Sequence, residues 1–237
     1  PFMDAETRKN LERISVATVS MQLLKRGLRR VVMAGVRPLN APVKPLLGEA
    51  FTLRFIPARE DLSAPAVLGA DGYVPRHAIE EVPEGAVLVI DARRDAETAV
   101  LGDLILERLK VRGVAGVVAD GGVRDAAEAI AVGLPVFAAG PAAPAPIVGL
   151  AAGDTGTRIG CGGVAVIPGD IIKADGDGVV VIPRDLAAEV AADGVAQERF
   201  ERFAKQKIQA GRPIIGVYPP SPETQKEYDG WRDPEDV

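Results

Sequence analysis

Residues 114–138 read VAGVVADGGVRDAAEAIAVGLPVFA, and this stretch decides the fold class. It holds two short apolar runs, 114–120 and 135–138, on either side of a candidate helix over 126–132 that Gly133 ends. Short apolar runs bounded by glycine are typical of buried strands, and strands that alternate with helices predict a parallel sheet with crossover helices.

The same pattern extends outward in both directions. An apolar run over 86–91 is followed by a candidate helix over 104–112, and residues 48–56 alternate as a half-buried strand does. Short strands over 163–167 and 178–182, next to Gly-Asp turns, predict a β-rich layer. We therefore expect an α/β layered sandwich with a central parallel or mixed sheet and a β-rich second half.

The rest of the chain contains helices and irregular segments. Helical spacing is present near 7–24 and again over 185–209, whereas residues 57–85 are rich in proline, glycine and acids and predict a long loop. No linker clearly divides the chain. We expect one domain over 1–210 and a C-terminal extension over 211–237.

Composition excludes several classes of protein. The chain of 237 residues is 47% hydrophobic but only 4% aromatic, so its core must be mostly aliphatic. A net charge of −5 argues against direct nucleic-acid binding, and a single cysteine, Cys161, excludes an internal disulfide framework. We see no membrane-spanning run and no signal sequence, and expect a cytoplasmic protein.

One group of residues has the composition of a chemical site. Asp103 begins a predicted helix, where the amides of Leu104 and Ile105 have no helical acceptor, and Arg124-Asp125 begins the next helix. Successive carboxyl ends of parallel strands lie at one sheet edge, so both loops are expected to face one crevice. There the arginine and the amides suit a substrate carboxylate, and two carboxylates suit Mg²⁺ or Mn²⁺.

A simpler interpretation is also open. Asp103 and Asp125 can each cap a helix, and an arginine next to an aspartate is often only a surface ion pair. The residue types alone favour that simpler interpretation.

The motifs resemble those of the RraA-like family. The matching stretches are Gly102-Asp103-Leu104-Ile105, then Arg112 to Asp125, then Gly133-Leu134-Pro135-Val136-Phe137, with further likeness at 161–164, 168–170 and 177–180. The family includes regulators of ribonuclease E activity and class II 4-hydroxy-4-methyl-2-oxoglutarate aldolases. The aldolases of this family share a motif in which an acid is followed by twenty residues and then by Arg-Asp. In this chain Asp103, the twenty residues Leu104–Val123 and Arg124-Asp125 fit that spacing.

This resemblance implies an RraA-like sandwich that assembles as a trimer or a dimer of trimers. It implies that Asp125 binds Mg²⁺ (or Mn²⁺) directly and that Asp103 holds water bound to the metal. Arg124 would bind the substrate together with Gly102 and the amides of Leu104 and Ile105. An acid from the C-terminal helix of a neighbouring subunit would complete the site, and Glu198 and Glu201 are both candidates.

The implied function is a metal-dependent lyase of small 2-oxo acids that releases pyruvate through an enolate. It would be a 4-hydroxy-4-methyl-2-oxoglutarate-type aldolase, an oxaloacetate decarboxylase, or both. No lysine lies in the cluster to form a Schiff base, which fits a metal route. Two alternatives remain open: a non-catalytic regulator that binds and inhibits a ribonuclease, and a lyase of a sugar-derived 2-oxo-3-deoxy acid.

Overall fold

The computed structural model describes residues 3–234, whose contacts form two compact units. Unit 1 consists of the described residues up to Ile14 and from Ala188 onward, and unit 2 consists of Ser15–Ala187. The boundary predicted between residues 210 and 211 falls inside unit 1, and the division of the sequence at that point stays a prediction. Within the described residues, no helix is long and apolar enough to cross a membrane.

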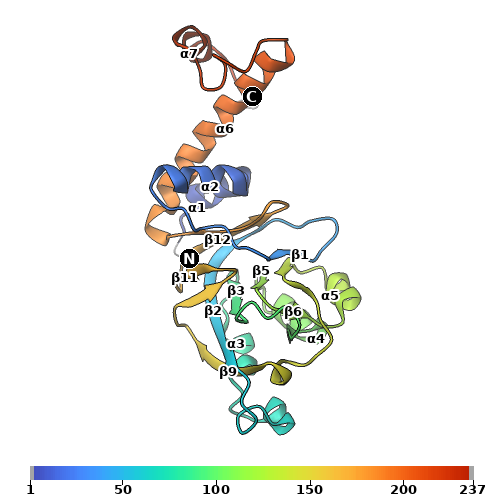
Figure 1. The fold of residues 1–237 in the computed structure, drawn as a ribbon. Coiled ribbons are helices and arrows are strands. Elements are labelled where there is room, and N and C mark those ends of the chain that lie inside the picture. Colours follow the sequence, from blue (N-terminus) through green and yellow to red (C-terminus); the bar gives the residue numbers. More distant parts are fainter. Residues whose placement is uncertain (1–2, 235–237) are drawn as a thin grey trace. The chain divides into compact units, whose positions relative to one another are not determined.

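Unit 2 is built on a mixed sheet. Among the described residues this sheet has eight strands, in the order β1-β7-β5-β3-β2-β12-β13, with β9 also paired to β2 (Figure 1). Its parallel centre contains β2 (Leu46–Pro57), β3 (Val87–Asp91), β5 (Gly116–Ala119) and β7 (Val136–Ala138). Its antiparallel strands are β1 (Arg37–Pro38), β9 (Leu150–Thr155), β12 (Ile171–Asp175) and β13 (Gly178–Ile182).

The sheet is nearly closed on itself. The strands β1 and β13 lie at opposite ends of the strand order, yet they are in contact. An antiparallel bridge between Val32 and Val180 joins the segment before β1 to β13. The predicted mixed α/β sandwich is thus confirmed.

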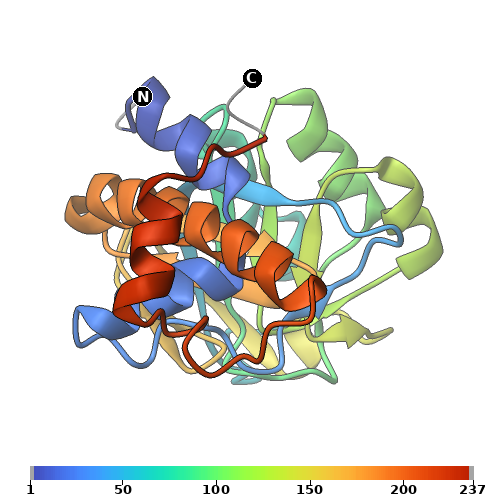
Figure 2. The same ribbon diagram turned by 90° about the horizontal axis from the view of Figure 1, so that it is seen from above.

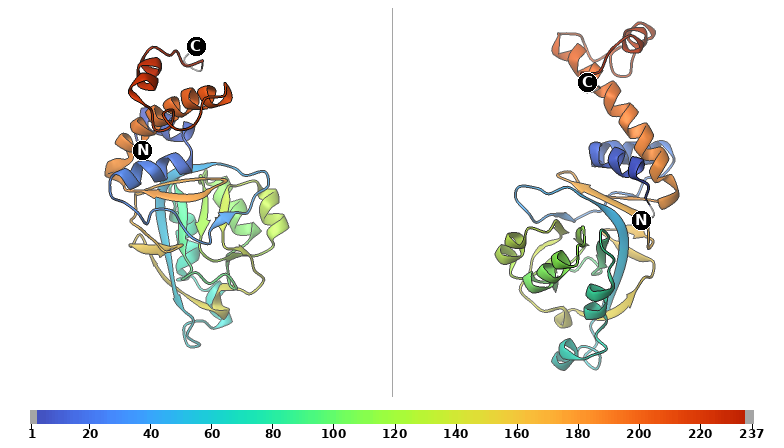
Figure 3. Two further views of the ribbon diagram at one scale, coloured as in Figure 1. Left: turned by 45° about the horizontal axis from the view of Figure 1, so that its top comes forward. Right: turned by 180° about the vertical axis from the view of Figure 1, so that it is seen from behind.

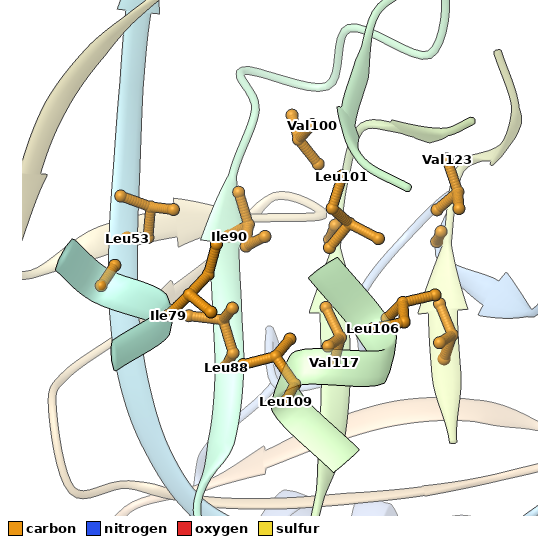
Figure 4. Packing of buried hydrophobic residues seen from close by; sticks show 14 of the residues in the cluster. Leu53, Ile79, Leu88, Ile90, Val100, Leu101, Leu106, Leu109, Val117 and Val123 are labelled. Atoms are coloured by element: carbon orange, nitrogen blue, oxygen red, sulfur yellow. The ribbon is translucent and has the colours of Figure 1, made fainter. Parts of the chain in front are cut away.

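Alternating side chains of the central strands fill two cores. Leu88 and Ile90 of β3 face the helices α3 (Val74–Glu81), α4 (Asp103–Val111) and α5 (Ala126–Val132), as Figure 4 shows for part of this core. Val87 and Val89 face the opposite core, which contains the hairpin of β10 (Ile159–Cys161) and β11 (Val164–Val166). The parallel strands are apolar on both faces, as expected for a sheet covered on both sides.

Unit 1 contains the helices α1 (Ala5–Arg13), α6 (Ala187–Gln209) and α7 (Pro222–Asp229). The chain turns back after α6, so that α7 lies beside the C-terminal half of that helix (Figures 2 and 3). An aromatic cluster joins them, formed by Phe200, Phe203, Tyr218, Tyr228 and Trp231.

The helical character expected near 7–24 is confirmed, and the segment consists of two helices, α1 and α2 (Val16–Lys25), because Ser15 caps the second one. Two other expectations about the elements were wrong. The predicted loop over 57–85 contains α3 and a short 3₁₀ turn, Pro65–Gly69. The strands of the second half do not all form a separate layer, since β12 and β13 extend the main sheet through β2.

Candidate functional site

A second, smaller parallel sheet positions the candidate residues. Its strands are β4 (Ala99–Leu101), β6 (Gly122–Val123) and β8 (Gly140–Pro141), which follow β3, β5 and β7 along the chain. Helix α4 begins directly after β4, and α5 begins shortly after β6. The pairing of β4 with β6 therefore brings the first turns of both helices together.

The loops that carry the predicted residues are in contact. The amide of Arg124 donates to the carbonyl of Leu101 at 2.9 Å. A Cβ atom placed on Gly102 would lie 3.5 Å from the Cβ of Arg124 and 3.6 Å from Oδ2 of Asp125. Asp103, the next residue, is the first of α4. Residues 22 and 23 positions apart in the chain thus adjoin one another.

Neither predicted acid caps a helix with its side chain. The N-cap residue of α4 is Gly102, and that of α5 is Asp125, whose side chain accepts no capping hydrogen bond. Asp125 instead has a left-handed backbone, with φ of 49°. Within residues 3–234, the side chains of Asp103, Arg124 and Asp125 make no hydrogen bond or ion pair. The structure thus supports neither the capping nor the surface ion-pair interpretation.

The start of α4 presents free backbone amides. Its first helical hydrogen bond runs from the amide of Leu106 to the carbonyl of Gly102 at 3.1 Å. The amides of Leu104 and Ile105 precede that bond and have no helical acceptor. Such a helix start favours an anion.

A cavity of about 280 Å³ adjoins Arg124 and Asp125. Its other lining residues are Val123, Ala126, Pro141, Ala142 and Ala143, from β6, α5 and the segment around β8. The wall beside the charged residues is therefore made of small apolar side chains. A cavity of this size can hold a small organic acid.

The donor atoms fit a hard divalent cation. Among the described residues, no group of three or more His, Cys, Asp or Glu side chains could hold a metal ion. Asp103 and Asp125 would supply two carboxylates at most. Magnesium is often held by one or two carboxylates, with water and substrate oxygens completing its shell.

Glu198 and Glu201 both lie on α6 in unit 1. They line a cavity of about 360 Å³ with Arg13, Arg202 and Lys205. Oε1 of Glu201 accepts hydrogen bonds from Nε2 of Gln197 at 2.8 Å and from the hydroxyl of Tyr218 at 3.1 Å. The role of either acid at a neighbour's site stays a prediction.

One buried acid near the site was not singled out from sequence. Asp120, which follows β5, is 3% exposed. Burial raises the pKa of its carboxyl above the ordinary value, while hydrogen bonds from the amides of Gly162, Ala92 and Arg94 lower it. The apolar run that ends in this acid was the only sequence signal, since its partners are far away in the chain.

Comparison with known proteins supports the resemblance found in the sequence. A family model described as "RraA-like: Aldolase/RraA" matches residues 13–181. A protein of Halalkalibacterium halodurans named "Putative 4-hydroxy-4-methyl-2-oxoglutarate aldolase" is 34% identical over 179 residues, covering 70% of this chain and 79% of the relative. An uncharacterized protein of Methanocaldococcus jannaschii is 33% identical over 210 residues, covering 84% and 93% respectively.

A solved structure resembles this fold closely. It is Streptomyces coelicolor RraAS2, described as an unusual member of the RNase ES inhibitor RraA protein family. It is 33% identical to this chain, with a TM-score of 0.78. The match covers 86% of this chain and 98% of that structure.

Proposed function

The chain belongs to the RraA-like family, and on that premise we propose that it is a divalent-metal-dependent lyase of small 2-oxo acids that releases pyruvate. The substrates would be of the 4-hydroxy-4-methyl-2-oxoglutarate type, oxaloacetate, or both. One observation carries the proposal: Asp103, Arg124 and Asp125 form no side-chain pair within residues 3–234, although the loops that bear them adjoin. Charged groups left without partners at one place are available to a charged ligand.

The substrate carboxylate is assigned to Arg124 and the start of α4. A guanidinium can donate two parallel hydrogen bonds to a carboxylate, which fixes its orientation as well as its position. The amides of Leu104 and Ile105 supply further donors, and Gly102 leaves the approach open because it has no side chain. These groups would hold the acid end of the substrate beside the two aspartates.

Asp125 and Asp103 would hold the cation, Asp125 directly and Asp103 through water. When bound, Mg²⁺ or Mn²⁺ would stabilise the negative charge that develops on the ketone oxygen as the carbon–carbon bond breaks. The proton that leaves the 4-hydroxyl as the carbon–carbon bond breaks must pass to a base, and we assign Asp103 to hydrogen-bond the water that accepts it. The same water would return a proton to carbon 3 of the enolate, which gives pyruvate.

Pyruvate release, coupled to lactate dehydrogenase, tests the proposal. Oxaloacetate and 4-hydroxy-4-methyl-2-oxoglutarate would be supplied with Mg²⁺, with chelator, and with Arg124→Ala. We expect metal-dependent release that falls about 100-fold or more in the variant, because charge-assisted hydrogen bonds are lost. Arg29→Ala, at an exposed arginine in the irregular segment that follows α2, is the control. No release from the wild-type protein with either substrate would contradict the proposal.

A second candidate function is inhibition of a ribonuclease by direct binding. The likeness to RraAS2 over nearly all of that structure favours it. A ribonuclease assay with micromolar protein tests it, and here Arg124→Ala should inhibit as well as the wild type does. If the protein shows lyase activity but does not inhibit the ribonuclease, the second function is excluded and only the lyase function remains.

A further inference from the structure

The carboxylate of Asp120 connects separate segments of unit 2. Its Oδ1 accepts the amide of Ala92 at 2.7 Å, and its Oδ2 accepts the amide of Gly162 at 3.0 Å. Ala92 belongs to the loop between β3 and β4, and Gly162 lies in the β10–β11 turn. One buried acid thus holds two backbone amides from two distant segments.

The loop between β3 and β4 needs such support. Arg93 and Arg94 have φ of 58° and 60°, in the left-handed region that residues other than glycine rarely occupy. Strained residues of this kind persist where the surrounding structure fixes them. The amide of Ala92, which bonds to Asp120, directly precedes Arg93, so the carboxylate holds the loop next to the strained residues.

The same loop packs against the segment that leads to the candidate site. The amide of Gly122 donates to the carbonyl of Thr98 at 2.9 Å. A Cβ on Gly121 would lie 2.5 Å from the Cβ of Ala92, and a Cβ on Gly122 would lie 3.2 Å from the carbonyl oxygen of Ala96. The loop therefore shapes the path of residues 121–123, which Arg124 and Asp125 follow directly.

We infer that Asp120 is a positioning residue: by holding the loop of residues 92–98, it sets where Arg124 and Asp125 lie relative to the start of α4. Each of its two oxygens accepts a backbone amide, and the residue is 3% exposed. The link to catalysis rests on the proposed lyase function, whereas the link between Asp120 and the loop does not.

Asp120→Asn tests this inference, with Asp170→Asn as a matched control. Asp170 is also a buried acid, and its Oδ2 accepts the amide of Ile167 at 2.8 Å in the turn before β12. Both variants replace an acceptor oxygen with a donor group next to a backbone amide, so both should lose stability. Only Asp120→Asn should lower kcat for pyruvate release, by about ten-fold or more, because small displacements of positioned groups are costly. Asp170→Asn should keep kcat within about two-fold of the wild type, since it leaves loop 92–98 untouched.

Hydrogen exchange by mass spectrometry supplies a readout that needs no substrate. In the wild type, the amides of Ala92 and Gly162 should exchange slowly. Asp120→Asn should speed exchange over 92–98 and 121–125, and Asp170→Asn should speed it only near 167–171. If the wild type releases no pyruvate, the lyase proposal fails, and exchange alone decides the role of Asp120.

Three results would overturn the inference. One is fast exchange of the amides of Ala92 and Gly162 in the wild type, which also decides the matter if Asp120→Asn does not fold. Another is unchanged exchange over 121–125 in the variant. The third is a fall in kcat without any change in exchange, which would assign Asp120 to the reaction itself.

Discussion

Gly122 shows how tightly the backbone is packed on the way to the candidate site. A Cβ at this position would lie 2.3 Å from the Cβ of Ala142. We expect Gly122→Ala to lower the free energy of unfolding by about 1–3 kcal/mol, because the added methyl must displace backbone. Urea denaturation measures this.

The control for that substitution is Gly160→Ala in β10. A Cβ at Gly160 would meet nothing within 4 Å, so we expect a change within about 0.5 kcal/mol. Equal losses from the two variants would show that steric crowding at Gly122 is not the cause.

Residue types at the site were predictable, and their partners were not. The contact between the Asp103 loop and Arg124-Asp125 follows from parallel topology, since both follow adjacent strands of one sheet edge. The hydrogen bonds of Asp120 could not be predicted, because they join residues 28 and 42 positions apart that only the folded chain brings together.

At the scale of elements, the start of α2 can be tested directly. The side chain of Ser15 accepts the amide of Thr18 at 3.1 Å and so caps this helix. Replacement by alanine should cost about 1 kcal/mol in the free energy of unfolding, because a helix amide loses its acceptor. Chemical denaturation measures the loss. Ser20→Ala within α2 should cause none, as alanine favours the helix interior; a similar loss there would rule out capping as the cause.

Elements with a strong local pattern could be predicted from sequence. The strands and helices between residues 86 and 138 were largely found, because each is an apolar run or an amphipathic stretch ended by glycine. Strand β4 was missed because Ala99-Val100-Leu101 is too short to form a pattern, and only its pairing with β6 makes it a strand. Helix α3 was not predicted, because the prolines and glycines around it are typical of a loop.

At the scale of the whole molecule, acid sensitivity should come from exposed ion pairs in both units. In unit 2, Arg108 lowers the pKa of Glu80, and in unit 1, Lys207 and then Arg212 lower the pKa of Glu227. A carboxylate with a lowered folded pKa stabilises the protein above its unfolded pKa, and this stabilisation is lost as the pH falls through the folded pKa. Burial raises the pKa values of the Asp120 and Asp170 carboxyls. The contribution of these two groups to the stability of the folded state therefore increases as the pH falls.

The double variant Glu80→Gln/Glu227→Gln isolates the first effect. In thermal melts from pH 7 to pH 3, the wild type should have the higher melting temperature at neutral pH. This difference from the variant should disappear as the pH falls below about 4.5, where free glutamate is about half protonated. High salt should shrink the difference at neutral pH, because the pairs are exposed and screened. A difference in melting temperature that is the same at pH 3 and pH 7 would mean that the glutamines act through packing, and that the acid response of the molecule arises elsewhere.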